Sequence, residues 1–110
     1  LGYLYRDTGM VDEAIGEYRT ALRYAPDYAD AHRLIGEAFI IKKDPSSAIE
    51  NLFRAVDLAP GSAEANNGLG KAFEMSGEHV RAALEYETAL SLDPLLLEAA
   101  EGLRRTRFKP

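Results

Sequence analysis

The sequence predicts an all-α protein, an α-solenoid of antiparallel helical hairpins. The first observation is an internal repeat, because Pro26, Pro60 and Pro94 follow one another at a spacing of 34 residues. The second is that apolar residues within each unit recur at three- and four-residue steps, which is helical periodicity. The third is that no segment alternates apolar and polar residues as a half-buried strand does.

The same period extends to many positions besides the prolines. In each unit a glycine follows Leu or Ile, an aromatic residue comes three positions later, and small alanines recur at fixed places further on. The repeated residues are Gly2, Gly36 and Gly70; Tyr5, Phe39 and Phe73; Ala14, Ala48 and Ala82; and Ala21, Ala55 and Ala89. Chance does not hold one period at so many positions, so we expect the units to share one local structure.

Each unit contains two helices separated by a short break. In chain order we expect helices at about residues 1–8, 12–25, 29–42, 46–59, 63–76, 80–93 and 97–107. Gly9 and Gly77 are expected to close the first helix of their units in the left-handed conformation. Asp44 and Pro45 are typical of an N-cap and a first helical residue, and Lys43 belongs to the same break.

The prolines separate one hairpin from the next, because a proline interrupts helical hydrogen bonding. Asp27, or Gly61 with Ser62, is expected to cap the helix that follows.

Gly36 and Gly70 lie in the middle of predicted helices, where a glycine costs ~1 kcal/mol relative to alanine. Close approach of the paired helix, at the small residues Ala48 and Ala82, is expected to offset that cost. A leucine at either glycine should therefore destabilise the fold by about 1 to 3 kcal/mol.

Together these residues resemble the tetratricopeptide repeat, whose pattern has the same period. The resemblance implies a right-handed superhelix and a single array over residues 1–110. It divides the array into an N-terminally truncated repeat at 1–26, repeats at 27–60 and 61–94, and a C-terminal capping helix at 95–110. Departures from the pattern are His32 and Asn66 in place of Trp, and Leu52 in place of the aromatic residue found at Tyr18 and Tyr86.

Composition excludes several functional classes. With 13 basic and 18 acidic residues the formal net charge is −5, which disfavours nucleic-acid binding, and the absence of cysteine excludes disulfides and thiolate chemistry. No apolar stretch approaches the ~20 residues that a membrane-spanning helix needs, so we expect no membrane insertion. The basic run at 104–109 suits the C-terminal end of a capping helix. Because the sequence does not start with Met, we expect it to be a fragment of a longer protein. We also expect a cytoplasmic location.

No combination of residues indicates catalysis, a cofactor or a metal. His32 and His79 fall on different hairpins, so a zinc site is not expected. Gly68 and Gly70 lack the third glycine and the preceding strand of a dinucleotide loop, and no phosphate-binding loop surrounds Lys71. We therefore predict a protein that is not an enzyme and has no cofactor.

The resemblance implies that the first helices of the hairpins line a concave surface that binds a peptide or protein segment. The expected binding residues are Tyr3, Arg6, Asp30, Arg33, Glu37, Ile40, Ile41, Glu64, Asn67, Lys71, Glu74, Met75 and Arg105; Asp7, Glu98 and Glu101 share this face. Acidic residues outnumber basic ones in this set, so the preferred ligand should be neutral to basic.

One subset of the family holds the terminal carboxylate of chaperones with a Lys, two Asn, a Lys and an Arg. The corresponding positions here are Arg33, Glu37, Gly68, Glu98 and Gly102, which cannot form a basic carboxylate pocket. Chaperone-tail binding is therefore disfavoured.

The resemblance implies a non-catalytic interaction module or scaffold with a protein or peptide partner. The alternative is a targeting or oligomerisation arm of a larger multidomain enzyme, and the sequence flanking this segment would separate the two.

The ends of the array offer a surface for a homodimer. Leu95, Leu96 and Leu97 form an apolar run between hairpins, and Leu1 and Leu4 lie at the other end. Sedimentation at several concentrations should show a dimer that Leu96→Asp or Leu4→Asp disrupts. A strictly monomeric chain across the micromolar range would refute self-association.

Overall fold

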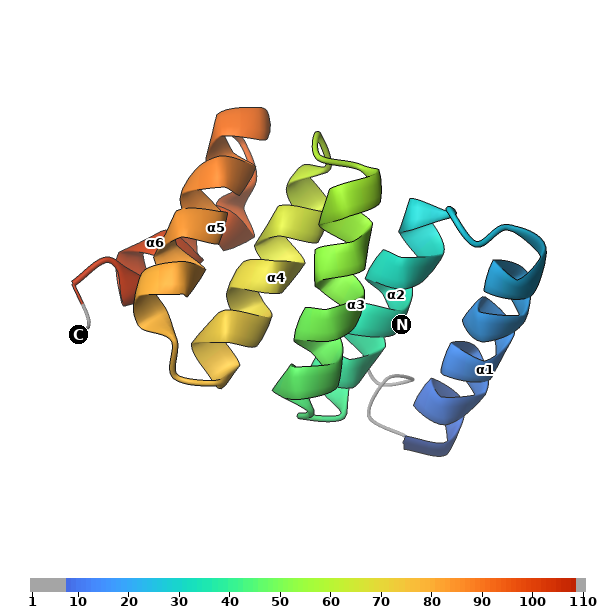
Figure 1. Ribbon diagram of the computed structural model, residues 1–110. Coiled ribbons are helices and arrows are strands. Elements are labelled where there is room, and N and C mark those ends of the chain that lie inside the picture. Colours follow the sequence, from blue (N-terminus) through green and yellow to red (C-terminus); the bar gives the residue numbers. More distant parts are fainter. Residues whose placement is uncertain (1–7, 109–110) are drawn as a thin grey trace.

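The computed structural model describes residues 8–108, which form six α-helices and, within that range, no strand. The helices are α1 (Thr8–Tyr24), α2 (Ala29–Ile41), α3 (Pro45–Leu58), α4 (Ala63–Met75), α5 (His79–Leu92) and α6 (Leu97–Thr106). They follow one another in chain order along the molecule, with α1 at one end and α6 at the other (Figure 1). The predicted all-α fold of stacked hairpins is confirmed.

The bounds of α2 to α6 agree with the sequence prediction to within one residue at each end. Helix α1 differs, because it begins at Thr8 instead of residue 12 and runs through Gly9. The prediction that Gly9 ends a helix is therefore wrong. Gly9 is the second described residue of α1 and is itself helical. The helix expected at 1–8 lies outside the described residues except for Thr8, which starts α1.

The break between α2 and α3 forms as predicted. The Asp44 carboxylate accepts hydrogen bonds from the backbone N–H of Ser47 at 3.2 Å and from its hydroxyl at 2.8 Å, and Pro45 is the first helical residue. Lys43 adopts the left-handed conformation, with φ of 62°. The equivalent residue of the next repeat, Gly77, does the same after α4, with φ of 82°.

Of the two helix caps predicted after the prolines, one is confirmed and one is wrong. Ser62 caps α4, its hydroxyl accepting from the N–H of Ala65 at 3.1 Å. Asp27 does not cap α2, because the N-cap position is occupied by Tyr28, whose side chain makes no capping hydrogen bond. Asp27 lies one residue too early in the chain to reach the free N–H groups of the first turn.

Two large side chains fill the centres of the hairpin stacks. Leu52 on α3 and Tyr86 on α5 are fully buried, each with no exposed surface. Leu52 lies between two glycines, since a Cβ added to Gly36 of α2 would be 2.5 Å from Leu52 Cγ, and one added to Gly68 of α4 would be 3.0 Å from Leu52 Cδ2.

Tyr86 repeats this arrangement one unit later. A Cβ on Gly70 of α4 would lie 2.8 Å from Tyr86 Cε1, and one on Gly102 of α6 would lie 2.4 Å from Tyr86 Cζ. The glycines do lie at helix contacts, but their nearest neighbours are Leu52 and Tyr86. The expected neighbours, Ala48 and Ala82, are buried in the same core. The missing side chains therefore make room for a large residue.

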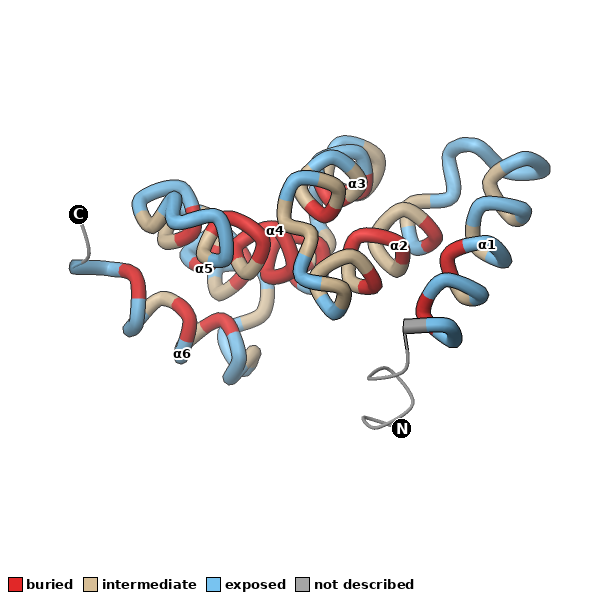
Figure 2. The backbone as a smooth tube through the Cα atoms, turned by 90° about the horizontal axis from the view of Figure 1, so that it is seen from below, coloured by how far each residue is buried: buried red, intermediate tan, exposed pale blue. Residues whose placement is uncertain are grey.

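The stack of α1 on α2 lacks this arrangement. Leu34 of α2 occupies the place that Gly68 and Gly102 have in the later first helices, and Tyr18 of α1 is only half-buried. A hollow of about 140 Å³ remains beside Tyr18 and Leu34. By contrast nine of the thirteen residues of α4 are buried, and Figure 2 shows this buried segment in the middle of the molecule.

The leucine run between α5 and α6 is not uniform. Leu96 is half-buried and packs against the core, whereas Leu95 is 90% and Leu97 is 69% exposed. Leu96→Asp would disturb the core, so the choice of Leu96 as a surface test is wrong, and Leu95 and Leu97 are the accessible positions. Leu1 and Leu4 lie outside the described residues, and self-association stays a prediction.

The glycine contacts predict opposite effects for the same substitution at two places. Gly102→Ala should lower the free energy of unfolding by about 1 to 3 kcal/mol, because the new methyl group collides with the Tyr86 ring. Gly16→Ala on α1 meets no atom within 4 Å and should raise it by roughly 0.5 to 1 kcal/mol. Denaturant unfolding of both variants checks this, and an unchanged or raised free energy of unfolding for Gly102→Ala would contradict the role given to Gly102.

Candidate interaction surface

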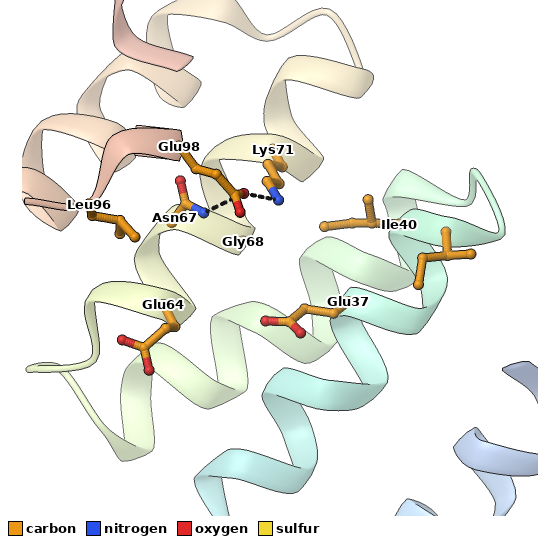
Figure 3. A pocket seen from close by; sticks show the side chains of 9 residues that line it. Glu37, Ile40, Glu64, Asn67, Gly68, Lys71, Leu96 and Glu98 are labelled. Carbon is orange, nitrogen blue, oxygen red and sulfur yellow. Dashed lines mark hydrogen bonds and ion pairs between the residues drawn. The ribbon is translucent and has the colours of Figure 1, made fainter. Parts of the chain in front are cut away.

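A hollow of about 280 Å³ lies along the first helices of the hairpins, between α2, α4 and the start of α6 (Figure 3). Its lining residues are Glu37, Ile40, Ile41, Glu64, Asn67, Gly68, Lys71, Leu96 and Glu98. Within α2 and α4 these positions are three or four residues apart, so each helix presents them on one face. Six of the expected binding residues, and Glu98, are thus brought together.

Lys71 at the hollow is already paired. Its ammonium group forms an ion pair with the Glu98 carboxylate, and the Asn67 amide donates a hydrogen bond to Glu98 at 3.4 Å. The hydrogen bond from Lys71 holds the pKa of Glu98 below its ordinary value, so this carboxylate stays charged. The charge of Lys71 is therefore balanced before any anionic ligand arrives.

Arg33 on α2 is also paired with carboxylates. Its guanidinium donates to the Glu37 carboxylate at 2.7 Å and lies 3.8 Å from Asp30. Neither Arg33 nor Asp30 lines the hollow. Arg33 and Lys71 thus both have carboxylate partners.

Two acceptors at the hollow remain unused among the described residues. Glu64 is exposed and makes no ion pair or side-chain hydrogen bond there. The Oδ1 atom of Asn67 is buried and has no hydrogen-bond partner, although an unpaired buried acceptor is costly. The apolar side chains of Ile40, Ile41 and Leu96 border the same space. The surface therefore offers one accessible carboxylate, Glu64, beside an apolar wall.

Three further expected residues lie away from the hollow. Met75 is exposed at the end of α4. Glu74 accepts a hydrogen bond from the Tyr86 hydroxyl at 2.7 Å and two from Arg105, at 2.8 Å and 3.1 Å. This network joins α6 to α4 and α5, so Glu74 and Arg105 stabilise the fold. Tyr3, Arg6 and Asp7 lie outside the described residues.

Sequence reasoning missed two lining residues, Gly68 and Leu96. Gly68 was absent from the expected set because it has no side chain, and its neighbour Asn67 was the signal. Leu96 belongs to the apolar run that was assigned to self-association. Glu101, expected on this face, is exposed on α6 but does not line the hollow.

Over residues 8–108, no group of three or more His, Cys, Asp or Glu side chains is placed to hold a metal ion. Over the same residues, no helix is long and apolar enough to cross a membrane.

Stacked hairpins with a polar hollow across their first helices define an α-helical repeat array. A tetratricopeptide repeat model matches residues 1–63 and residues 43–95, and the chain belongs to the tetratricopeptide repeat family. No curated protein sequence matches the chain.

Solved structures share the fold. The first TPR domain of human RPAP3 is 26% identical with a TM-score of 0.88, and the alignment covers 96% of this chain and 84% of that one. The first TPR of Spaghetti (RPAP3), bound to the HSP90 peptide SRMEEVD, has the same identity, TM-score and coverage. An O-GlcNAc transferase mutant of Thermobaculum terrenum is 30% identical with a TM-score of 0.85, covering 90% of this chain and 19% of that one.

The Tyr86 hydroxyl predicts sensitivity to alkali. Burial, and then the hydrogen bond to Glu74, raise the pKa of Tyr86 above its ordinary value. The contribution of Tyr86 is therefore complete below about pH 10, the pKa of an unfolded tyrosine, and is lost as the pH rises further. Tyr86→Phe should cost about 1 to 3 kcal/mol at neutral pH and reduce the loss of stability at alkaline pH.

Unfolding curves between neutral and alkaline pH check this prediction, with the exposed Tyr24→Phe as control. Tyr24→Phe should follow the unmodified chain throughout. A Tyr86→Phe variant with undiminished alkaline sensitivity would assign that sensitivity to other groups.

Proposed function

We propose that this chain is a non-catalytic protein-interaction module that binds an extended segment of a partner protein across α2, α4 and α6. The observation that carries the proposal is the hollow, in which an exposed Glu64 carboxylate without a partner among the described residues lies beside an apolar wall. An extended peptide has side chains that can cover the apolar side chains of Ile40 and Leu96.

Peptide binding by a similar domain supports the proposal. The Spaghetti domain, which has the same fold, was solved with a bound peptide. That peptide, SRMEEVD, contains three acidic residues. In this chain Arg33 and Lys71 are already paired with Glu37 and Glu98, so among residues 8–108 no free cation at the hollow favours an acidic ligand.

We infer instead that the ligand is neutral to basic. Three carboxylates and one ammonium group line the hollow, and Glu64 is the one carboxylate there without a partner among the described residues. A Lys or Arg of the ligand can pair with Glu64 at the exposed edge. Since such contacts are screened by salt, binding should weaken as ionic strength rises.

A second candidate function is a targeting or oligomerisation arm of a larger enzyme. The likeness to the O-GlcNAc transferase favours it, because the matching region is a small part of that enzyme's chain. In that case the same hollow would bind the segment that recruits the enzyme. A catalytic domain in the flanking sequence would support this candidate, and further repeats there would support a scaffold.

Titration with Lys/Arg-rich and Asp/Glu-rich peptide pools tests the charge preference. We expect tighter binding of the basic pool, and Glu64→Lys should weaken it roughly tenfold, which corresponds to ~1.4 kcal/mol. Glu64 is a cleaner target than Glu37, whose replacement would also release Arg33.

The matched control is Glu50→Lys, which makes the same charge change at an exposed position of α3 outside the hollow. It should bind the basic pool nearly as well as the unmodified chain. Tighter binding of the acidic pool, or an equal loss for both variants, would contradict a specific site at Glu64.

A further inference from the structure

A second hollow, of about 190 Å³, lies between the second helices α3 and α5, and we name it the second-helix groove. It is lined by Phe53, Phe73, Arg81, Leu84 and Glu85. Figure 1 shows α4, which carries Phe73, between α3 and α5. No residue of this groove lines the hollow of the first helices, so the two surfaces are separate.

Two apolar residues of this groove, Phe53 and Leu84, are not part of the repeat pattern. In the other units the position of Phe53 is occupied by Arg19 and Glu87, and all three are exposed. Phe53 is 46% exposed and contributes little to the core of its own stack.

Leu84 is a second position of the groove at which this repeat has a large apolar side chain and the others do not. Its counterparts are Gly16 and Glu50, both exposed, whereas Leu84 is a large apolar side chain that is 57% exposed. Two departures toward apolar side chains therefore meet at one hollow. The neighbouring stack builds the same fold with polar residues at these places, so stability does not explain them.

The floor of the groove is aromatic, and the Arg81 cation beside it already has partners. Phe73 is buried, and the Phe53 ring meets it edge-on, with centroids 5.8 Å apart and an interplanar angle of 77°. The Arg81 guanidinium lies 5.7 Å from the Phe73 ring centroid and pairs with Glu78 at 3.4 Å. The aromatic surface is thus formed before any ligand binds.

Glu85 is the unbalanced charge of the groove. Its side chain is half-buried and makes no hydrogen bond or ion pair with the residues the structure describes. Burial raises the pKa of Glu85, because the charged form loses contact with water. A cation placed beside this carboxylate would offset that cost.

We propose that the second-helix groove is a further docking site, for a partner segment that presents a large apolar side chain next to a Lys or Arg. The apolar side chain covers Phe53, Leu84 and the Phe73 ring, and the cation pairs with Glu85. Large side chains buried in a pocket supply much of the binding energy of an interface, and a complementary charge beside them adds specificity.

Amide chemical shifts of the isotope-labelled chain test the site with the acetylated peptide Gly-Lys-Phe-Lys-Gly. We expect saturable shifts in α3 and α5. The peptide Gly-Lys-Ala-Lys-Gly lacks the apolar anchor and Gly-Glu-Phe-Glu-Gly reverses the charge, so neither should produce these shifts. Shifts confined to α2, α4 and α6, or none that saturate in α3 and α5, would overturn the proposal.

Variants then assign the contacts. Leu84→Gln and Glu85→Gln should each weaken binding about fivefold or more. Both should fold, since the counterparts of these residues in α3 are the polar Glu50 and Asn51. Glu87→Gln, which removes an exposed carboxylate of α5 outside the groove, and Glu64→Lys on the other surface should leave the shifts in α3 and α5 unchanged. Undiminished binding by Leu84→Gln would overturn the site.

Discussion

A large side chain held between two glycines fixes the spacing of the helices in this array. Tyr86 can be fully buried because neither Gly70 nor Gly102 has a Cβ to occupy its space. The same contact brings α4 and α6 to the distance at which Lys71 meets Glu98 and Arg105 meets Glu74. The hollow on the first helices therefore depends on packing that takes place behind it, in the second helices.

Local chemistry explains why most helix ends were predictable from sequence. Asp44, Pro45 and Gly77 act through their own backbone and immediate neighbours, so their effect does not depend on the rest of the fold. The prediction for Asp27 is wrong because a capping side chain must stand at the N-cap position, and Asp27 lies one residue before it. The partner of Gly70 could not be read from the period, because the crossing of two helices decides which side chain lies opposite.

For the candidate surface too, the sequence predicts the features that lie within one helix but not the contacts between helices. Spacing of three and four residues correctly places Glu37 with Ile40 and Glu64 with Asn67 on shared helix faces, but it says nothing about pairing between helices. Glu74 and Arg105 are 31 residues apart and meet only in the folded array. Which charges stay free for a partner is therefore a tertiary property, and binding by the expected residues stays a prediction.

Leu34 of α2 stands where α4 has Gly68 and α6 has Gly102, and this difference affects which part of the array unfolds locally first. In a linear array each hairpin is stabilised mainly by its neighbours, so local unfolding follows the weakest junction. The junction of α1 with α2 has a half-buried Tyr18 and an unfilled hollow, whereas the later junctions are closed around Leu52 and Tyr86. Amide hydrogens of α1 should then exchange with solvent before those of α4.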